Sequence, residues 1–185
     1  SPRWRNFIPP KDSVEMFVAP EPRSMLFRIA IGGQGGREDS MLMESRLAGQ
    51  IDKRLAELGI TLPEAPVPAA NYVPTARTGN LLFISGQTSK TADGMITGKL
   101  GDGFSIEDAQ AAARVCALNL IAQAKAACDG DLDRVTRVVK LLGFVNATPD
   151  FDQHPAVING ASDLMVEVFG EKGRHARSAV GASSL

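Results

Sequence analysis

The chain is poor in cysteine, histidine and most aromatic side chains, and these shortages exclude several classes of protein. Its 185 residues include two cysteines, two histidines, one tryptophan and one tyrosine. Cys116 and Cys128 lie in an alanine-rich stretch, and their spacing to each other and to the histidines fits no metal motif. Two cysteines make no disulfide framework, so we expect reduced thiols in a cytoplasmic protein. We predict neither a metal nor another cofactor.

An excess of one charge and a long apolar run are also missing. Lysine and arginine number 20 against 21 acidic residues, for a net charge of -1. A protein that binds nucleic acid through phosphates usually has a basic excess, and base stacking needs aromatic side chains. The longest early apolar run is interrupted by Arg28 and is too short for a bilayer span or a signal peptide. We therefore expect no nucleic-acid partner and no membrane insertion.

Residues 1–44 differ from the rest of the chain. They contain several prolines, scattered arginines and a glycine-rich tract at 32–36, with no sustained hydrophobic period. The tract lacks the G-x-G-x-x-G spacing of a phosphate-binding loop, which favours a linker. We expect residues 1–44 to be an N-terminal extension or leader with little regular structure, and Met41 and Met43 are candidate natural starts.

Regular patterns begin at residue 45. Leucine and isoleucine repeat at helical spacing, so we predict an amphipathic helix at 45–58 that ends at Gly59, followed by a proline-rich connector that completes a segment reaching residue 69. Two strands should then form a hairpin around Thr78-Gly79-Asn80, since glycine and asparagine tolerate positive φ. The predicted strands are 72–77, 81–86, 135–145 and 176–185. The predicted helices are 105–127, where Ser105 followed by Asp108 is a cap signature, and 155–169, which Gly170 should end. Both helices are expected to cover one face of a mixed β-sheet, an α+β arrangement.

Arg177 is the first candidate for a ligand-binding residue. It lies in the strand-like segment His-Ala-Arg-Ser-Ala-Val at 175–180. A guanidinium is always charged and offers planar donors that fit a carboxylate bidentately. The alternative is an exposed strand arginine in a surface ion pair. His175 shares the strand face of Arg177 by alternation, so it either reaches the same cleft or is an ordinary, partly exposed histidine.

Several ordered motifs resemble the Rid family, also called the YjgF family. They are Asn-Tyr-Val at 71–73, Thr-Gly-Asn-Leu-Leu-Phe-Ile-Ser-Gly-Gln at 78–87, Ala-Leu-Asn-Leu at 117–120, Arg-Val-Val-Lys at 137–140, Val-Ile-Asn at 157–159 and Ala-Arg-Ser at 176–178. Their common order is far more specific than any one of them. The helix at 45–58 and Leu-Pro-Glu-Ala-Pro at 62–66 resemble a subgroup with an extra N-terminal helix.

The resemblance implies a chorismate-mutase-like fold, a homotrimer with clefts between subunits, and hydrolysis of reactive 2-imino acids or enamines to 2-oxo acids and ammonia. By similarity, Arg177 would bind the substrate carboxylate and Tyr72 would close the pocket. Gly86 would let backbone approach the ligand, Asn159 would supply an amide at the subunit interface, and Ser85 is a candidate lining residue. Alternatives without a role in ligand binding stay open: Tyr72 as a structural tyrosine, Gly86 as a strand bend and Asn159 as an exposed helical asparagine.

Two departures from the family weaken the catalytic expectation. Family members that deaminate imines often have a cysteine two residues after the arginine, where this chain has Ala179. They also have a glutamate on a last strand, and this sequence ends at Leu185 before such a strand. We therefore expect residues 70–185 to form a Rid-like domain without its last strand. A trimer that binds a small carboxylate without turnover is the alternative, and RNA cleavage is a third, disfavoured function.

Overall fold

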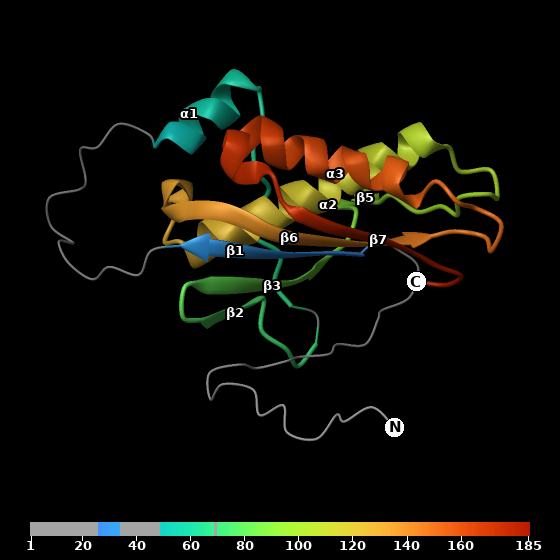
Figure 1. Cartoon of the computed structure of the whole chain (residues 1–185), viewed down its shortest axis with the longest axis horizontal. Coiled ribbons are helices and arrows are strands. Elements are labelled where there is room, and N and C mark those ends of the chain that lie inside the picture. Colours follow the sequence, from blue (N-terminus) through green and yellow to red (C-terminus); the bar gives the residue numbers. More distant parts are fainter. Residues whose placement is uncertain (1–25, 34–48, 69) are drawn as a thin grey trace, which may run out of the picture.

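A computed structural model describes residues 26–33, 49–68 and 70–185. A β-sheet forms one layer, and two long helices, α2 and α3, cover one of its faces (Figure 1). The strands are β1 (Leu26–Gly33), β2 (Thr75–Thr78), β3 (Leu81–Gln87), β6 (Val135–Asn146) and β7 (Ala176–Ala182), with a small separate hairpin of β4 (Lys90–Thr91) and β5 (Gly94–Met95). The helices are α1 (Gln50–Glu57), α2 (Ile106–Ala127) and α3 (His154–Phe169), with 3-10 turns η1 (Leu132–Arg134) and η2 (Gly170–Gly173).

The main sheet has five strands in the order β2-β3-β1-β6-β7. The pairing of β6 with β7 is parallel and the other pairings are antiparallel, which makes the sheet mixed. One row of register partners crosses the whole sheet: Thr75, Ile84, Ile29, Leu141 and Arg177. The predicted α+β fold class, with two helices on one face, is confirmed.

The position of β1 corrects the prediction for residues 1–44. Leu26–Gly33 forms a strand between β3 and β6 and pairs with both. The prediction of little regular structure is wrong for these eight residues, and the rest of 1–44 lies outside the described residues. The sequence of β1 shows no sustained alternation of apolar and polar residues. Hydrogen bonds to its two neighbouring strands stabilise it whatever its own β-propensity. Within the described chain, neither β3 nor β6 is therefore an edge of the sheet.

The ends of α2 and α3 follow from local chemistry. Ser105 caps α2 by accepting a hydrogen bond from the Asp108 N–H at 3.0 Å. Gly170 ends α3 with a φ of 60°, a left-handed conformation that glycine adopts without strain. The helices also approach closely, because a Cβ on Gly160 would lie 2.1 Å from the Gln110 carbonyl oxygen. These two predicted helices and their caps are confirmed.

The N-terminal helix is held by a residue far along the chain. The N–H groups of Gln50 and Ile51 donate to the two carboxylate oxygens of Asp133 at 2.8 and 2.9 Å. A carboxylate at a helix N-terminus satisfies free donors and complements the helix dipole. Within the described residues, helix α1 (Gln50–Glu57) begins at Gln50. Gly59 follows its end with a φ of 65°, which confirms the predicted glycine cap. The predicted first turn at 45–48 lies outside the described residues.

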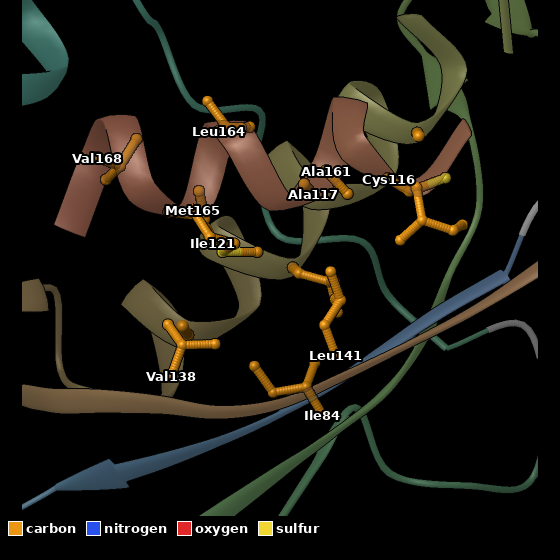
Figure 2. Packing of buried hydrophobic residues seen from close by; sticks show 14 of the residues in the cluster. Ile84, Cys116, Ala117, Ile121, Val138, Leu141, Ala161, Leu164, Met165 and Val168 are labelled. Atoms are coloured by element: carbon orange, nitrogen blue, oxygen red, sulfur yellow. The ribbon is translucent and has the colours of Figure 1, made fainter. Parts of the chain in front are cut away.

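The core lies between the two long helices and the sheet. Figure 2 shows Ile121 of α2 and Met165 of α3 close to Val138 and Leu141 of β6. These four side chains are essentially inaccessible to solvent. Burial of this apolar layer is the main contribution to the free energy that holds α3 over the sheet. The packing thereby sets the position of the polar side chains of α3 that lie beside β7.

Candidate functional site

Arg177 lies on β7, the edge strand next to α3. Its register partner on β6 is Leu141, whose side chain is buried beneath the helices, so the two side chains leave the sheet on the same face. The Arg177 Nη1 donates to Asn159 Oδ1 at 2.8 Å and to Ser162 Oγ at 3.2 Å. Two of the residues predicted to form the site, Arg177 and Asn159, are thus in direct contact.

The contacts of Arg177 leave one side of its guanidinium open. Both N–H groups of Nη1 are used by Asn159 and Ser162. Nε and Nη2 donate no hydrogen bond within the described part of the chain, and the residue is exposed. Nε–H and one Nη2–H are parallel, which is a geometry that binds both oxygens of one carboxylate. The exposed side chain is therefore held through Nη1, and its bidentate edge has no hydrogen-bond partner within the described residues.

His175 joins the same cluster. Its Nδ1 lies 2.6 Å from the Gly173 carbonyl oxygen and its Nε2 lies 3.1 Å from Ser162 Oγ. Burial lowers the pKa of His175 below its ordinary value of 6.5, and the positive charge of Arg177 lowers it further, while the hydrogen bond to Gly173 acts in the opposite direction. The prediction that His175 shares the strand face of Arg177 is confirmed, since both side chains contact Ser162.

Tyr72, Ser85 and Gly86 lie near the edge of the sheet opposite to β7. Ser85 and Gly86 are in β3, and β1 and β6 separate that strand from β7. Three strand spacings amount to about 14 Å. Tyr72 precedes β2 and is 49% exposed, which does not fit a core tyrosine. Within one chain, the predicted site residues therefore form two groups that do not meet.

Ser85 has a structural role beyond that predicted from the sequence. Its hydroxyl donates to the Val73 carbonyl oxygen at 2.6 Å, and its N–H donates to the Pro74 carbonyl oxygen at 2.9 Å. These bonds tie β3 to the segment that follows Tyr72. We conclude that Ser85 positions the backbone around Tyr72, and that its hydroxyl proton is already used.

Ser162 is the member of the cluster that sequence reasoning missed. It follows Asn159 by three residues in α3, so both lie on one side of the helix. The available signal was this spacing, together with the expectation that both long helices cover one face of the sheet. Ser178, by contrast, points to the opposite face of the sheet, where it accepts a hydrogen bond from Lys140 Nζ at 2.7 Å. Ser178 is therefore not part of the cluster around Arg177.

Catalysis by a cysteine thiolate and metal binding find little support in the described ranges. Burial raises the pKa of the Cys116 and Cys128 thiols, which disfavours the reactive thiolate form. Residues 26–33, 49–68 and 70–185 contain no group of three or more histidine, cysteine, aspartate or glutamate side chains placed to hold a metal ion. In the same ranges, no helix has the length and apolar character needed to cross a membrane.

Comparisons with known proteins identify the family. Residues 52–183 match the family model described as "YjgF/chorismate mutase-like, putative endoribonuclease". The chain is 51% identical to the Trypanosoma cruzi protein TCP17 over 140 residues, which cover 75% of this chain and 87% of that one. The chain therefore belongs to the YjgF family, as its motifs predicted.

Solved structures agree with this assignment. A protein of unknown function from Agrobacterium tumefaciens is 50% identical, with a TM-score of 0.67 over 73% of this chain and 84% of that one. A protein from Shewanella oneidensis MR-1, described as a putative endoribonuclease, is 37% identical, with a TM-score of 0.68 over 71% of this chain and 87% of that one. The chorismate-mutase-like fold is thus shared with both.

Proposed function

We propose that the protein hydrolyses reactive small 2-imino acids, or their enamine tautomers, to 2-oxo acids and ammonia, in clefts between the subunits of a homotrimer. The observation that carries this proposal is the exposed Arg177 guanidinium, which two contacts hold through Nη1 while Nε and Nη2 donate no hydrogen bond within the described residues. A 2-imino acid carries one carboxylate next to the reacting carbon. Binding of that carboxylate therefore places the C=N bond close to Arg177.

The reaction needs little more than positioning. Water attacks the imine carbon, the electrons of the C=N bond move to nitrogen, and a carbinolamine forms. Loss of ammonia from this intermediate gives the 2-oxo acid, and both protons of the water end on the nitrogen, one on addition and one as the C–N bond breaks. An iminium carbon is already electrophilic, so orientation by Arg177 supplies much of the required assistance.

The need for more than one subunit is supported by the separation of the two residue groups. Gly86 lies in β3, about three strand spacings, or about 14 Å, from the strand of Arg177, and Tyr72 precedes β2, the strand beyond β3. A second copy that brings its Tyr72 edge next to β7 would complete the pocket. The face of the sheet opposite the helices also exposes apolar side chains, with Phe83 at 42% and Val180 at 43%, which favours association of that face.

The test is imine lifetime in a semicarbazide trapping assay. A 2-imino acid is generated from an amino acid by an oxidase, and the semicarbazone yield is measured with and without the protein. Wild type should shorten the lifetime and Arg177→Ala should not. Arg174→Ala is the matched control, because Arg174 is exposed, pairs with Glu171 in its own turn and should not matter. An unchanged lifetime with wild type rejects the proposal.

A trimer that binds a small carboxylate without turnover is the second candidate, favoured by Ala179 at the position two residues after Arg177. Calorimetry with pyruvate and 2-oxobutanoate distinguishes it from the enzyme, since it predicts binding that depends on Arg177 and no loss of imine. The family description raises RNA cleavage as a third candidate. RNA cleavage that survives extensive purification and disappears in Arg177→Ala would support it over the other two.

A further inference from the structure

A directed chain of hydrogen bonds leads from Arg177 to the backbone of η2. The Gly173 carbonyl oxygen can only accept, so His175 Nδ1, 2.6 Å away, must carry the proton. In the neutral imidazole Nε2 is then an acceptor, and the Ser162 hydroxyl, 3.1 Å away, must donate to it. Arg177 Nη1 has only donors, so Ser162 Oγ accepts from it at 3.2 Å. The direction of each bond is thereby determined.

The remaining capacity of Ser162 is one lone pair. A hydroxyl has one proton and two acceptor positions. The proton is directed at His175 and one acceptor position is taken by Arg177. The other can accept a hydrogen bond from a water molecule. Ser162 contacts Nη1 of the guanidinium whose Nε and Nη2 edge would hold the substrate carboxylate, so such a water would be near the bound substrate.

We propose that His175 is the proton acceptor of the hydrolysis and that Ser162 relays the proton to it from the attacking water. This role rests on the proposed function of the Arg177 site. Nothing in the family comparisons assigns either residue, and the role gives the cluster a base without a glutamate or a cysteine.

The transfer is balanced in protons and electrons. A bond forms between the water oxygen and the imine carbon as the C=N electron pair moves to nitrogen. The water proton passes to Ser162 Oγ while the Ser162 proton passes to His175 Nε2, which becomes an imidazolium. The imidazolium then returns its proton by the same path to the nitrogen, which gives the carbinolamine. As the C–N bond breaks, the hydroxyl proton of the carbinolamine follows this path to the nitrogen, so that ammonia leaves, the C=O bond forms and His175 is neutral again.

The charge environment favours neutral His175 in the resting site. Arg177, on the same strand, disfavours a second positive charge, and burial acts in the same direction, so the pKa of His175 is lowered. Glu171 and Arg174 of the adjacent turn bind each other through a contact of 2.9 Å. A base must be unprotonated before it can act, and these surroundings keep His175 in that form at neutral pH.

His175→Gln and Ser162→Ala test the relay in the full-length protein. Glutamine retains an acceptor for Ser162 but cannot take up a proton, and alanine removes the relay. We expect kcat to fall about 100-fold in each variant, within the usual range for general base catalysis. The Kd for 2-oxobutanoate, measured by calorimetry, should change less than about 3-fold, since Arg177 still binds the carboxylate. Ser178→Ala is the control on the opposite sheet face and should keep wild-type kcat.

The pH profile separates proton transfer from a merely structural role. Wild-type kcat/KM should decrease at acid pH with an apparent pKa below 6.5, and His175→Gln should lack that limb. Near-normal kcat in His175→Gln, or an unchanged acid limb, overturns the relay while leaving the Arg177 site intact. Absence of turnover in wild type, with 2-oxobutanoate still bound, rejects the proposed enzymatic function and the relay together.

Discussion

Arg177 and Asn159 are joined by a hydrogen bond of 2.8 Å between Nη1 and Oδ1. This bond links an edge strand to the helix that covers it, across 18 positions of sequence. It also explains how a long, exposed side chain is held in one orientation. Side-chain order of this kind lowers the entropy lost when a ligand binds.

Asn159→Ala should weaken binding of a 2-oxo acid about 5-fold, because a hydrogen bond of this kind contributes about 1 kcal/mol. Calorimetry with 2-oxobutanoate measures the effect. Asn159→Asp should weaken binding more, because the new carboxylate pairs with Arg177 and competes with the ligand. Equal affinities for wild type and both variants would show that Asn159 does not orient the guanidinium.

The stability of the protein should depend on His175 below neutral pH. Its pKa is lowered in the folded chain, so the unfolded chain binds a proton first as the pH decreases through 6.5. The contribution of His175 to the unfolding free energy is thus fully present above pH 6.5 and is lost toward the lower, folded pKa. Urea unfolding at pH 7.5 and 5.5 should show a larger decrease in wild type than in His175→Gln. The same decrease in both proteins would contradict the pKa shift.

Gly160→Ala should destabilise the fold by about 3 kcal/mol. The added Cβ would lie 2.1 Å from the Gln110 backbone oxygen, so α2 and α3 must move apart. Denaturant unfolding measures the loss, and Asp163→Ala, an exposed position on α3, serves as the control that should change stability by less than about 0.5 kcal/mol. A Gly160→Ala protein as stable as the control would mean that the two helices are farther apart.

Ile31→Ala tests the place of β1 in the sheet. Ile31 is 3% exposed, and truncation of a buried isoleucine typically costs about 3 kcal/mol. Val67→Ala is the matched control, because Val67 is 88% exposed and its truncation should be nearly neutral. Denaturant unfolding of both variants gives the comparison. A neutral Ile31→Ala variant would contradict the strand between β3 and β6.

Local pattern was sufficient for most elements of the YjgF fold. Ser105 followed by Asp108 predicted the start of α2, and Gly59 and Gly170 predicted two helix ends, because capping and positive φ are decided by a few adjacent residues. The strand β1 was not predicted. Its stabilising partners, β3 and β6, lie about 50 and 100 positions away, and pairing with them leaves no local mark.

The candidate site also combines features that the sequence predicted with features that only the tertiary structure decided. The sequence by itself determined the fold class, the family motifs and the choice of Arg177 as a carboxylate-binding residue, since these depend on residue type and order. Only the tertiary structure placed Ser162 and His175 beside Arg177 and put Tyr72 and Gly86 on the far side of the sheet. The physical reason is that strand order and helix packing set these distances, and they arise from contacts between segments remote in sequence.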